Sequence, residues 1–195
     1  MLSLSKSIWA LDNFRDPKCS FVVSSSLNSI NNDLATYTAS QVPESVSIVV
    51  NLIDFEMPIY STDKENENGI PDLAYKFKDI LKNADGIVIS FAEHNGVYTA
   101  AFKNIFDWIS RIEKVVWYNK PMFLLATSNG DRGAITVLEI AHSRISRGNP
   151  YEIPVFSLPN FNKNFHIEKG ILDEELDVKY RKSLKIFISN ITDGN

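Results

Sequence analysis

Five short apolar stretches rich in valine, isoleucine and phenylalanine constrain the fold of this chain more than any other feature. They lie at residues 20–23, 46–52, 86–91, 121–127 and 154–158. Most of them lack alternation with polar residues, which is typical of parallel strands that are buried on both faces. The sequence therefore predicts a parallel sheet whose two faces are both covered.

Segments with helical periodicity separate these strands. Apolar residues recur at three- and four-residue spacing within 30–42, 73–84, 102–112, 134–145 and 180–191. Strand and helix therefore alternate five times, which requires right-handed crossovers and helices on both faces of the sheet. We expect a doubly wound α/β domain of three layers. Ligands of such domains bind beyond the carboxyl ends of the strands, where the strand order reverses.

Length and composition indicate one soluble domain. The chain has 195 residues, of which 44% are hydrophobic, and it contains no run of 18 apolar residues that would cross a membrane. Its net charge is −4 and its lysines and arginines are scattered, so we expect no nucleic-acid partner. No pattern of metal ligands is present, and we expect no metal site.

The first residues predict an N-terminal extension. We expect residues 1–19 to precede a domain formed by residues 20–195. Ser7 and Asp12 interrupt the apolar stretch, which argues against a signal peptide. Cys19 is the single cysteine, so no internal disulfide can form, and we expect a cytoplasmic protein.

Three polar loops follow the first, third and fourth predicted strands and should meet at one edge of the sheet. The first, residues 24–32, carries only uncharged hydrogen-bonding groups among its polar side chains. Backbone N–H groups at the start of a helix can hold a phosphate there without a lysine. The alternative is an ordinary turn followed by a helix N-cap. Neither a P-loop nor a dinucleotide-binding glycine pattern is present.

The second loop contains Glu93, His94, Asn95 and Gly96. Asn95 tolerates unusual backbone angles, and Gly96 lets the backbone approach a flat ligand. Glu93 and His94 can be interpreted as an acid and a base. The alternative is that Glu93 caps local backbone donors while His94 is partly exposed packing.

The third loop, residues 127–133, has Gly130 and Gly133 on either side of Arg132. It can follow the far edge of the same flat ligand. It can equally be a strand-to-helix turn with a solvated arginine, and the sequence leaves both interpretations open.

Taken together, these loops resemble those of the NAD(P)H-dependent FMN reductase family, flavodoxin-like proteins that include quinone, azo and chromate reductases. The closest stretch is A-E-H-N-G-V-Y at 92–98, followed by F-K-N at 102–104 and D-W at 107–108. The family pattern there is P-E-Y-N-G-S-x-P-x-x-L-K-N-x-x-D-W. M-P-I-Y at 57–60 resembles the L-P-L-Y that follows the family's second strand. The likeness covers about residues 20–160.

The resemblance implies a flavodoxin-like five-stranded parallel sheet with order 2-1-3-4-5, FMN as cofactor and NAD(P)H as co-substrate. It implies hydride transfer from nicotinamide to flavin N5, then two-electron reduction of a small acceptor: a quinone, azo compound, metal oxyanion or free flavin. It also implies a homodimer or homotetramer, and no side chain need be catalytic. The residues expected to bind FMN are Ser24, Ser26, Ser29 and Asn31 at the phosphate, Ala92, Glu93, His94, Asn95 and Gly96 along one side of the ring, and Ser128, Asn129 and Gly130 along another.

Some positions depart from the family pattern and keep two rivals open. Ser25 stands where the family has glycine, and His94 stands where it has tyrosine. One rival is a flavodoxin-like binding module that has lost or weakened flavin binding. The other is a hydrolase or transferase acting on nucleoside-like ligands, for which Glu93 is the only near nucleophile. The aromatics considered for a subunit interface, with packing inside the monomer as the alternative, are Trp117, Tyr118, Phe161 and Phe165.

Overall fold

One central sheet organises the molecule. The computed structural model describes residues 18–24 and 29–193, with the backbone alone for 18–24. The strands of the sheet are β1 (Lys18–Ser24), β2 (Ser45–Asn51), β3 (Gly86–Phe91), β6 (Met122–Thr127) and β7 (Val155–Leu158). They lie in the order β2-β1-β3-β6-β7, and each neighbouring pair is parallel. Numbered as these five strands follow one another along the chain, the order is 2-1-3-4-5.

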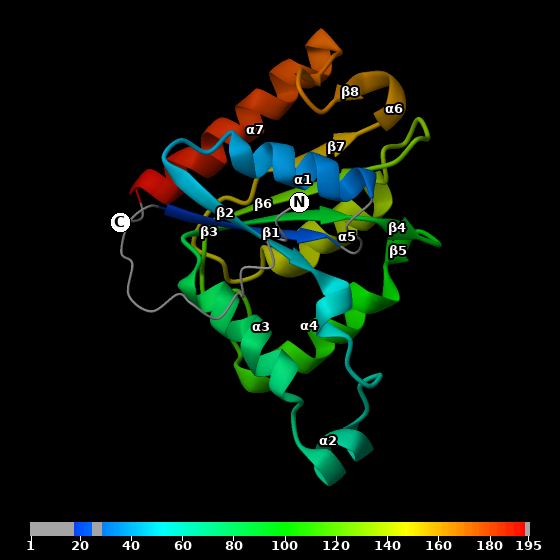
Figure 1. The fold of residues 1–195 in the computed structure, drawn as a ribbon, viewed down its shortest axis with the longest axis vertical. Coiled ribbons are helices and arrows are strands. Elements are labelled where there is room, and N and C mark those ends of the chain that lie inside the picture. Colours follow the sequence, from blue (N-terminus) through cyan, green and yellow to red (C-terminus); the bar gives the residue numbers. More distant parts are fainter. Residues whose placement is uncertain (1–17, 25–28, 194–195) are drawn as a thin grey trace, which may run out of the picture.

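Helices cover both faces of this sheet, as the sequence predicts (Figure 1). On one face lie α1 (Ile30–Ser40) and α7 (Glu174–Asp193), and on the other lie α3 (Asp72–Asn83), α4 (Ala100–Ile112) and α5 (Ile135–Ile145). The three-layer α/β architecture follows from the right-handed crossovers that parallel strands require.

Each face of the sheet has its own hydrophobic core. In β6, Met122 and Leu124 belong to the cluster under α3, α4 and α5, whereas Phe123 and Leu125 belong to the cluster under α1 and α7. All four side chains are fully buried. Burial on both faces is the reason why the strands read as continuous apolar runs without polar alternation.

Several short elements are absent from the sequence prediction. They are the 3-10 turn η1 (Leu52–Phe55), the helices α2 (Thr62–Asn68) and α6 (Phe161–Asn164), and two hairpins made by β4 (Glu93–His94) with β5 (Val97–Tyr98) and by β8 (Phe165–His166) with β9 (Gly170–Ile171). Two-residue strands produce no apolar run, and α2 has no buried residue, so neither leaves a hydrophobic period in the sequence.

The aromatic residues considered for a subunit interface mostly pack inside the chain. Trp117, Phe161 and Phe165 are each less than 9% exposed. The ring of Trp117 stacks over that of Phe102 with centroids 6.4 Å apart, and Phe161 stacks on Phe165 at 4.8 Å. An interface role for these three side chains is therefore wrong, and the alternative of internal packing holds.

The two ends of the chain and one loop lie partly outside the described residues. The proposed extension at 1–19 and the domain limit at residue 20 stay predictions, since the first described residue is Lys18, where β1 begins. Ser26 lies in the undescribed stretch 25–28. Within the described part of the chain, no helix has the length and apolar character needed to span a bilayer.

Candidate functional site

The three polar loops leave adjacent parallel strands at one edge of the sheet, as predicted. Val23 of β1 is paired with Ile89 of β3, and Phe91 of β3 with Ala126 of β6, so the three strands end close together. Helices α1 and α5 begin at this edge, and the β4–β5 hairpin extends from it (Figure 1). The convergence follows from the parallel order, because carboxyl ends of parallel strands share one edge.

Asn31 is buried beneath this edge of the sheet. Its side chain is only 4% exposed, and Oδ1 accepts hydrogen bonds from Ser90 Oγ at 2.7 Å and from the Thr127 N–H at 3.2 Å. Its Nδ2 donates to the Thr127 carbonyl at 3.3 Å. One amide therefore joins the first turn of α1 to the ends of β3 and β6. The sequence suggested a phosphate contact for Asn31, whereas these bonds turn the side chain toward the strands.

The start of α1 matches the N-cap interpretation of the first loop. Ser29 has an extended backbone, and its Oγ accepts the N–H of Asn32 at 3.1 Å. This bond satisfies one of the donors that a helix start leaves unpaired. Because only the backbone of Ser24 is described and Ser26 is not, the phosphate role of this loop stays a prediction.

The second loop is a tight hairpin. Glu93 pairs with Tyr98, and His94 pairs with Val97. Asn95 and Gly96 make the turn, with φ of 52° and 81°. Two residues with positive φ form the type of turn that matches the twist of a hairpin, and Asn-Gly is its preferred sequence. A Cβ on Gly96 would meet nothing within 4 Å, so glycine serves the backbone angle there. The side chains of His94 and Asn95 are exposed.

The side chain of Glu93 reaches a different element. Its Oε2 accepts the backbone N–H of Val137, in the first turn of α5, at 3.0 Å. The carboxylate is half-buried and caps a helix donor, as in the capping alternative for Glu93, but this donor lies 44 positions away in the chain and is not local. Ala92, just before it, is small and half-buried at the end of β3.

The third loop is braced against the segment after β7. The Ser128 carbonyl accepts the Phe161 N–H at 3.1 Å, and the Gly130 carbonyl accepts the Asn160 N–H at 3.1 Å. Ser128 Oγ accepts the Gly130 N–H at 3.3 Å, and Asn129 Oδ1 accepts the Asn162 N–H at 3.4 Å. Asn129 and Gly130 are exposed at the rim.

Gly133 is a residue of this loop whose role the sequence did not reveal. Its φ is 58°, and an added Cβ would lie 2.5 Å from Ser157 Oγ and 2.7 Å from Pro159 N. Only glycine allows the loop backbone to pass this close to the end of β7. The following Ala134 also has positive φ.

Two cavities flank this edge. A water-sized cavity of about 10 Å³ lies at the end of β3, lined by side chains that include Ser90, Ala92 and Thr99. A wider groove of about 500 Å³ runs along β7, where its lining includes Arg132 and Lys179. The groove adjoins the third loop on the side of β7, away from β3.

The two remaining motifs of the sequence analysis contact each other. Asn104 of α4 accepts the Tyr60 N–H at 2.9 Å and donates to the carbonyls of Met57 at 3.0 Å and Pro58 at 3.2 Å. Trp108 Nε1 donates to the same Pro58 carbonyl at 2.7 Å. The loop at 57–60 is therefore held to α4 through its main chain.

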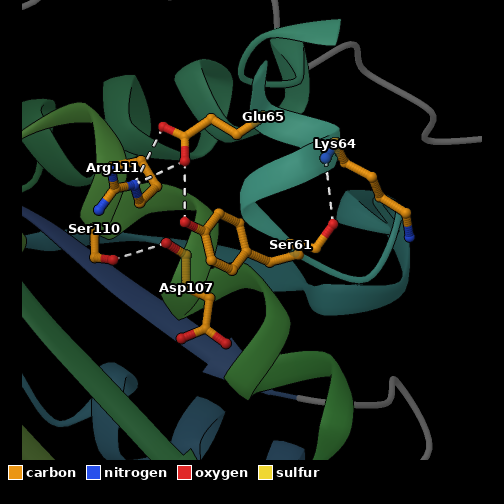
Figure 2. A network of polar contacts seen from close by, with 7 residues as sticks. Ser61, Lys64, Glu65, Asp107, Ser110 and Arg111 are labelled. Carbon is orange, nitrogen blue, oxygen red and sulfur yellow. Dashed lines mark hydrogen bonds and ion pairs between the residues drawn. The ribbon is translucent and has the colours of Figure 1, made fainter. Parts of the chain in front are cut away.

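A polar network continues from this loop into α2 (Figure 2). Tyr60 Oη donates to Glu65 Oε2 at 3.0 Å, and Arg111 of α4 contacts the same carboxylate oxygen at 3.0 Å. Ser61 caps α2 by accepting the Lys64 N–H. Since α2 buries no residue, these polar contacts are what hold it against α4.

One titratable group near the edge is unusual. The hydroxyl of Tyr98 is buried without a hydrogen-bond partner among the described residues. Burial raises the pKa of Tyr98, and the nearby Arg144 partly offsets this. Among the described side chains, no group of three or more His, Cys, Asp and Glu is placed to hold a metal ion.

Comparison with known proteins identifies the family. The sequence profile of the family described as NADPH-dependent FMN reductase matches residues 20–161. The chain belongs to this family. An NADPH:quinone oxidoreductase of Arabidopsis thaliana is similar in sequence, 31% identical over 141 residues, which are 70% of this chain and 70% of the relative. The resemblance stated from the sequence is confirmed.

Two other relatives match this chain over shorter lengths. A 2-hydroxy-1,4-benzoquinone reductase of a Burkholderia species is 35% identical over 119 residues, 60% of this chain and 62% of the relative. An NADPH azoreductase of Bacillus sp. (strain OY1-2) is 28% identical over 120 residues, 62% of this chain and 63% of the relative. The matches thus span less than two thirds of these two relatives.

Solved structures show the same fold. The flavoenzyme NAD(P)H:acceptor oxidoreductase of Paracoccus denitrificans has a TM-score of 0.68 at 20% identity, covering 91% of this chain and 98% of its own. An apo NADH:FMN oxidoreductase has a TM-score of 0.66 at 16% identity, covering 88% and 89%. The predicted flavodoxin-like α/β fold is confirmed by this likeness.

Proposed function

We propose that this protein is an FMN-dependent NAD(P)H oxidoreductase that reduces a small acceptor: a quinone, an azo compound, a metal oxyanion or free flavin. The observation that carries the proposal is that β1, β3 and β6 end together at one edge of the sheet, where the buried side chain of Asn31 joins the first turn of α1 to the ends of β3 and β6. Membership of the FMN reductase family supports it.

The described donor set fits FMN. Ala92, Gly96 and Gly130 carry little side-chain bulk, and Ser128 and Asn129 are uncharged hydrogen-bonding groups. A flat ring with several hydrogen-bond acceptors suits a rim of exposed backbone with small or neutral side chains.

The charged groups beside this rim have partners within the protein. Glu93 holds the Val137 N–H, Asp131 accepts a hydrogen bond from Asn160 at 2.9 Å, and Arg132 donates to Thr136 at 2.9 Å. These neutral partners orient the three side chains and leave their charges in place.

The residues that we assign to FMN are those expected from the family resemblance, with the exception of Asn31. Ser24, Ser26 and Ser29 would surround the phosphate at the N-terminus of α1, where unsatisfied N–H groups favour an anion. Residues 92–96 would line one side of the ring, and 128–130 another. We assign Asn31 to holding α1 against the strands, because its amide is already bonded to Ser90 and Thr127.

Bound FMN supplies the two-electron chemistry between nicotinamide and acceptor. The chain's own contribution is to bind and orient. Backbone N–H groups of the second and third loops would face the ring edge where negative charge grows on reduction. The Glu93 carboxylate is bonded to the Val137 N–H of α5, and we assign no catalytic acid. Solvent can supply the proton that the reduced flavin takes up.

We further propose that the protein works in the cytoplasm as a homodimer or homotetramer, with residues 1–19 as an extension of a domain at 20–195. The single cysteine, Cys19, and the family membership support these assignments. Gel filtration with light scattering measures the subunit number directly.

Purification tests the function. We expect a yellow protein with FMN bound at one per chain, which bleaches without oxygen when NADPH or NADH is added and regains its colour with a quinone. A colourless protein that cannot be reloaded with FMN contradicts the proposal and favours a binding module.

A further inference from the structure

Helix α5 begins without a cap of its own. The residue at its N-cap position is Ala134, which has left-handed backbone angles (φ 59°, ψ 35°) and makes no side-chain capping bond. An alanine side chain has no oxygen to accept a hydrogen bond. The first turn of a helix leaves four backbone N–H groups without an intrahelical partner, and capping residues normally satisfy one of them.

Glu93 supplies the missing cap from another part of the fold. Its Oε2 lies 3.0 Å from the N–H of Val137, a residue 44 positions later in the chain. Val137 is the third residue of α5, the position that an N-cap side chain usually reaches. A carboxylate there also faces the positive end of the helix dipole.

Both ends of this hydrogen bond belong to walls of the candidate site. Glu93 stands in β4, opposite Tyr98, whose ring packs 5.8 Å from Phe91 and 5.0 Å from Phe102. The hairpin is therefore anchored in the core under α4. At the other end, α5 starts directly after the loop at 128–134, and Val137 is fully buried.

We propose that Glu93 is a positioning residue that fixes the second loop against the third and so sets the distance between the two sides of the ring site. The inference deepens the proposed function and rests on it for the identity of the ligand. The contact itself belongs to the chain alone.

This role differs from that of an acid, base or nucleophile in what it requires of the side chain. Capping needs an oxygen that accepts a hydrogen bond, and a glutamine oxygen can accept one. Proton transfer or nucleophilic attack needs the carboxylate. Glu93→Gln therefore separates the two, and Glu93→Ala removes both.

Matched variants of the whole protein test the proposal. FMN binding is titrated by quenching of flavin fluorescence, and backbone exchange of 128–138 is measured by hydrogen–deuterium exchange mass spectrometry. Glu139→Ala is the control, because it removes an exposed carboxylate two residues beyond Val137 on the same helix. If Glu93→Ala does not fold, Glu93→Asp, with a shorter side chain, takes its place.

We expect Glu93→Ala to raise the Kd for FMN about tenfold and to speed exchange in 128–138, as loss of a cap does. Glu93→Gln should keep the wild-type exchange rate in 128–138, because the glutamine oxygen can still accept the Val137 N–H, and Glu139→Ala should match the wild type in both measurements. The inference is overturned if Glu93→Ala leaves both FMN affinity and exchange unchanged, or if Glu93→Gln binds FMN normally but loses turnover. Absence of FMN binding in the wild type would refute the proposed function, and the exchange measurement would still decide whether Glu93 holds α5.

Discussion

At the scale of single residues, the candidate site depends on buried polar contacts more than on exposed reactive groups. Asn31 accepts two hydrogen bonds and donates a third beneath the rim. Its sequence context, after a strand and at the start of a helix, equally suits a phosphate ligand and a structural amide. Only the position of Ser90 and Thr127 on neighbouring strands distinguishes the two, and that position is a property of the fold.

Replacing Asn31 with alanine should destabilise the protein by about 2–4 kcal/mol, because it leaves Ser90 Oγ and the Thr127 N–H buried without their acceptor. Urea denaturation followed by tryptophan fluorescence measures this loss. Asn190→Ala is the control, since the amide of this partly exposed residue donates to the Glu152 carbonyl at 2.9 Å. Equal losses in the two variants would contradict the role of Asn31.

Gly133→Ala should destabilise the protein by about 3 kcal/mol or more, because it adds a steric clash with Ser157 and Pro159 to the cost of a positive φ. Gly148→Ala is its control: φ there is 78°, but no atom lies within 4 Å of the added Cβ. We expect about 1–2 kcal/mol for that variant. If the two variants lose the same free energy of unfolding relative to the wild type, the loop and β7 can move apart to accept the added Cβ.

At the scale of elements, the sequence predicts those that bury apolar surface and misses those held by polar contacts. Strands β3 and β6 are recognisable because every side chain in them is buried. Helix α2 is held by the ion pair between Glu65 and Arg111 and buries nothing, so no hydrophobic period reveals it. The hairpin at 93–98 has a local signal in Asn95-Gly96, but the same two residues also suit a backbone that approaches a ligand, so the sequence does not distinguish the two.

Glu65→Gln should leave the free energy of unfolding almost unchanged, because the guanidinium of Arg111 is solvent-exposed and screened. Exchange of α2 backbone amides should nevertheless rise, since this contact fastens the helix to α4. Glu67→Gln, an exposed carboxylate on the same helix, is the comparison. Unchanged exchange in Glu65→Gln would show that α2 is held by other contacts.

At the scale of the whole molecule, the fold was predictable from the alternation of buried strands and helices, whereas the site was predictable only in outline. Parallel order brings residues 92–96 and 128–130 to one edge, and the sequence is enough to expect this. The sequence is not enough to predict which side chains turn inward. Asn31 and Glu93 are oriented by partners 44 or more positions away in the chain.

Stability of the whole molecule should fall as the pH rises above 10. Burial raises the pKa of Tyr180 well above its usual value of 10.0, and Tyr37, Tyr98 and Tyr118 shift in the same direction. Above pH 10 the unfolded chain releases phenolic protons that the folded chain retains, so unfolding becomes more favourable. Tyr180, which is 1% exposed, contributes up to about 1.4 kcal/mol per pH unit in this window, whereas the three partly exposed tyrosines contribute less because solvent screens them.

Lys78 acts in the opposite sense. Burial lowers its pKa, so the folded chain loses that proton first and gains relative stability as the pH approaches 10.5. Urea unfolding of wild type and Tyr180→Phe between pH 8 and 11 separates the contributions. The variant should show the shallower decline above pH 10, and parallel curves would contradict the assignment to Tyr180.

The attachment of the loop at 57–60 to α4 has an evolutionary consequence. The hydrogen bonds that Asn104 and Trp108 make to this loop all go to its carbonyl and N–H groups, and the ring of Trp108 also packs against that of Tyr60, with centroids 5.0 Å apart. None of these contacts uses the side chain of Ile59, which is 78% exposed. Mutations at Ile59 can therefore change the chemistry of this surface without altering the shape of the loop. A lineage is free to diversify at this position while its scaffold stays constant.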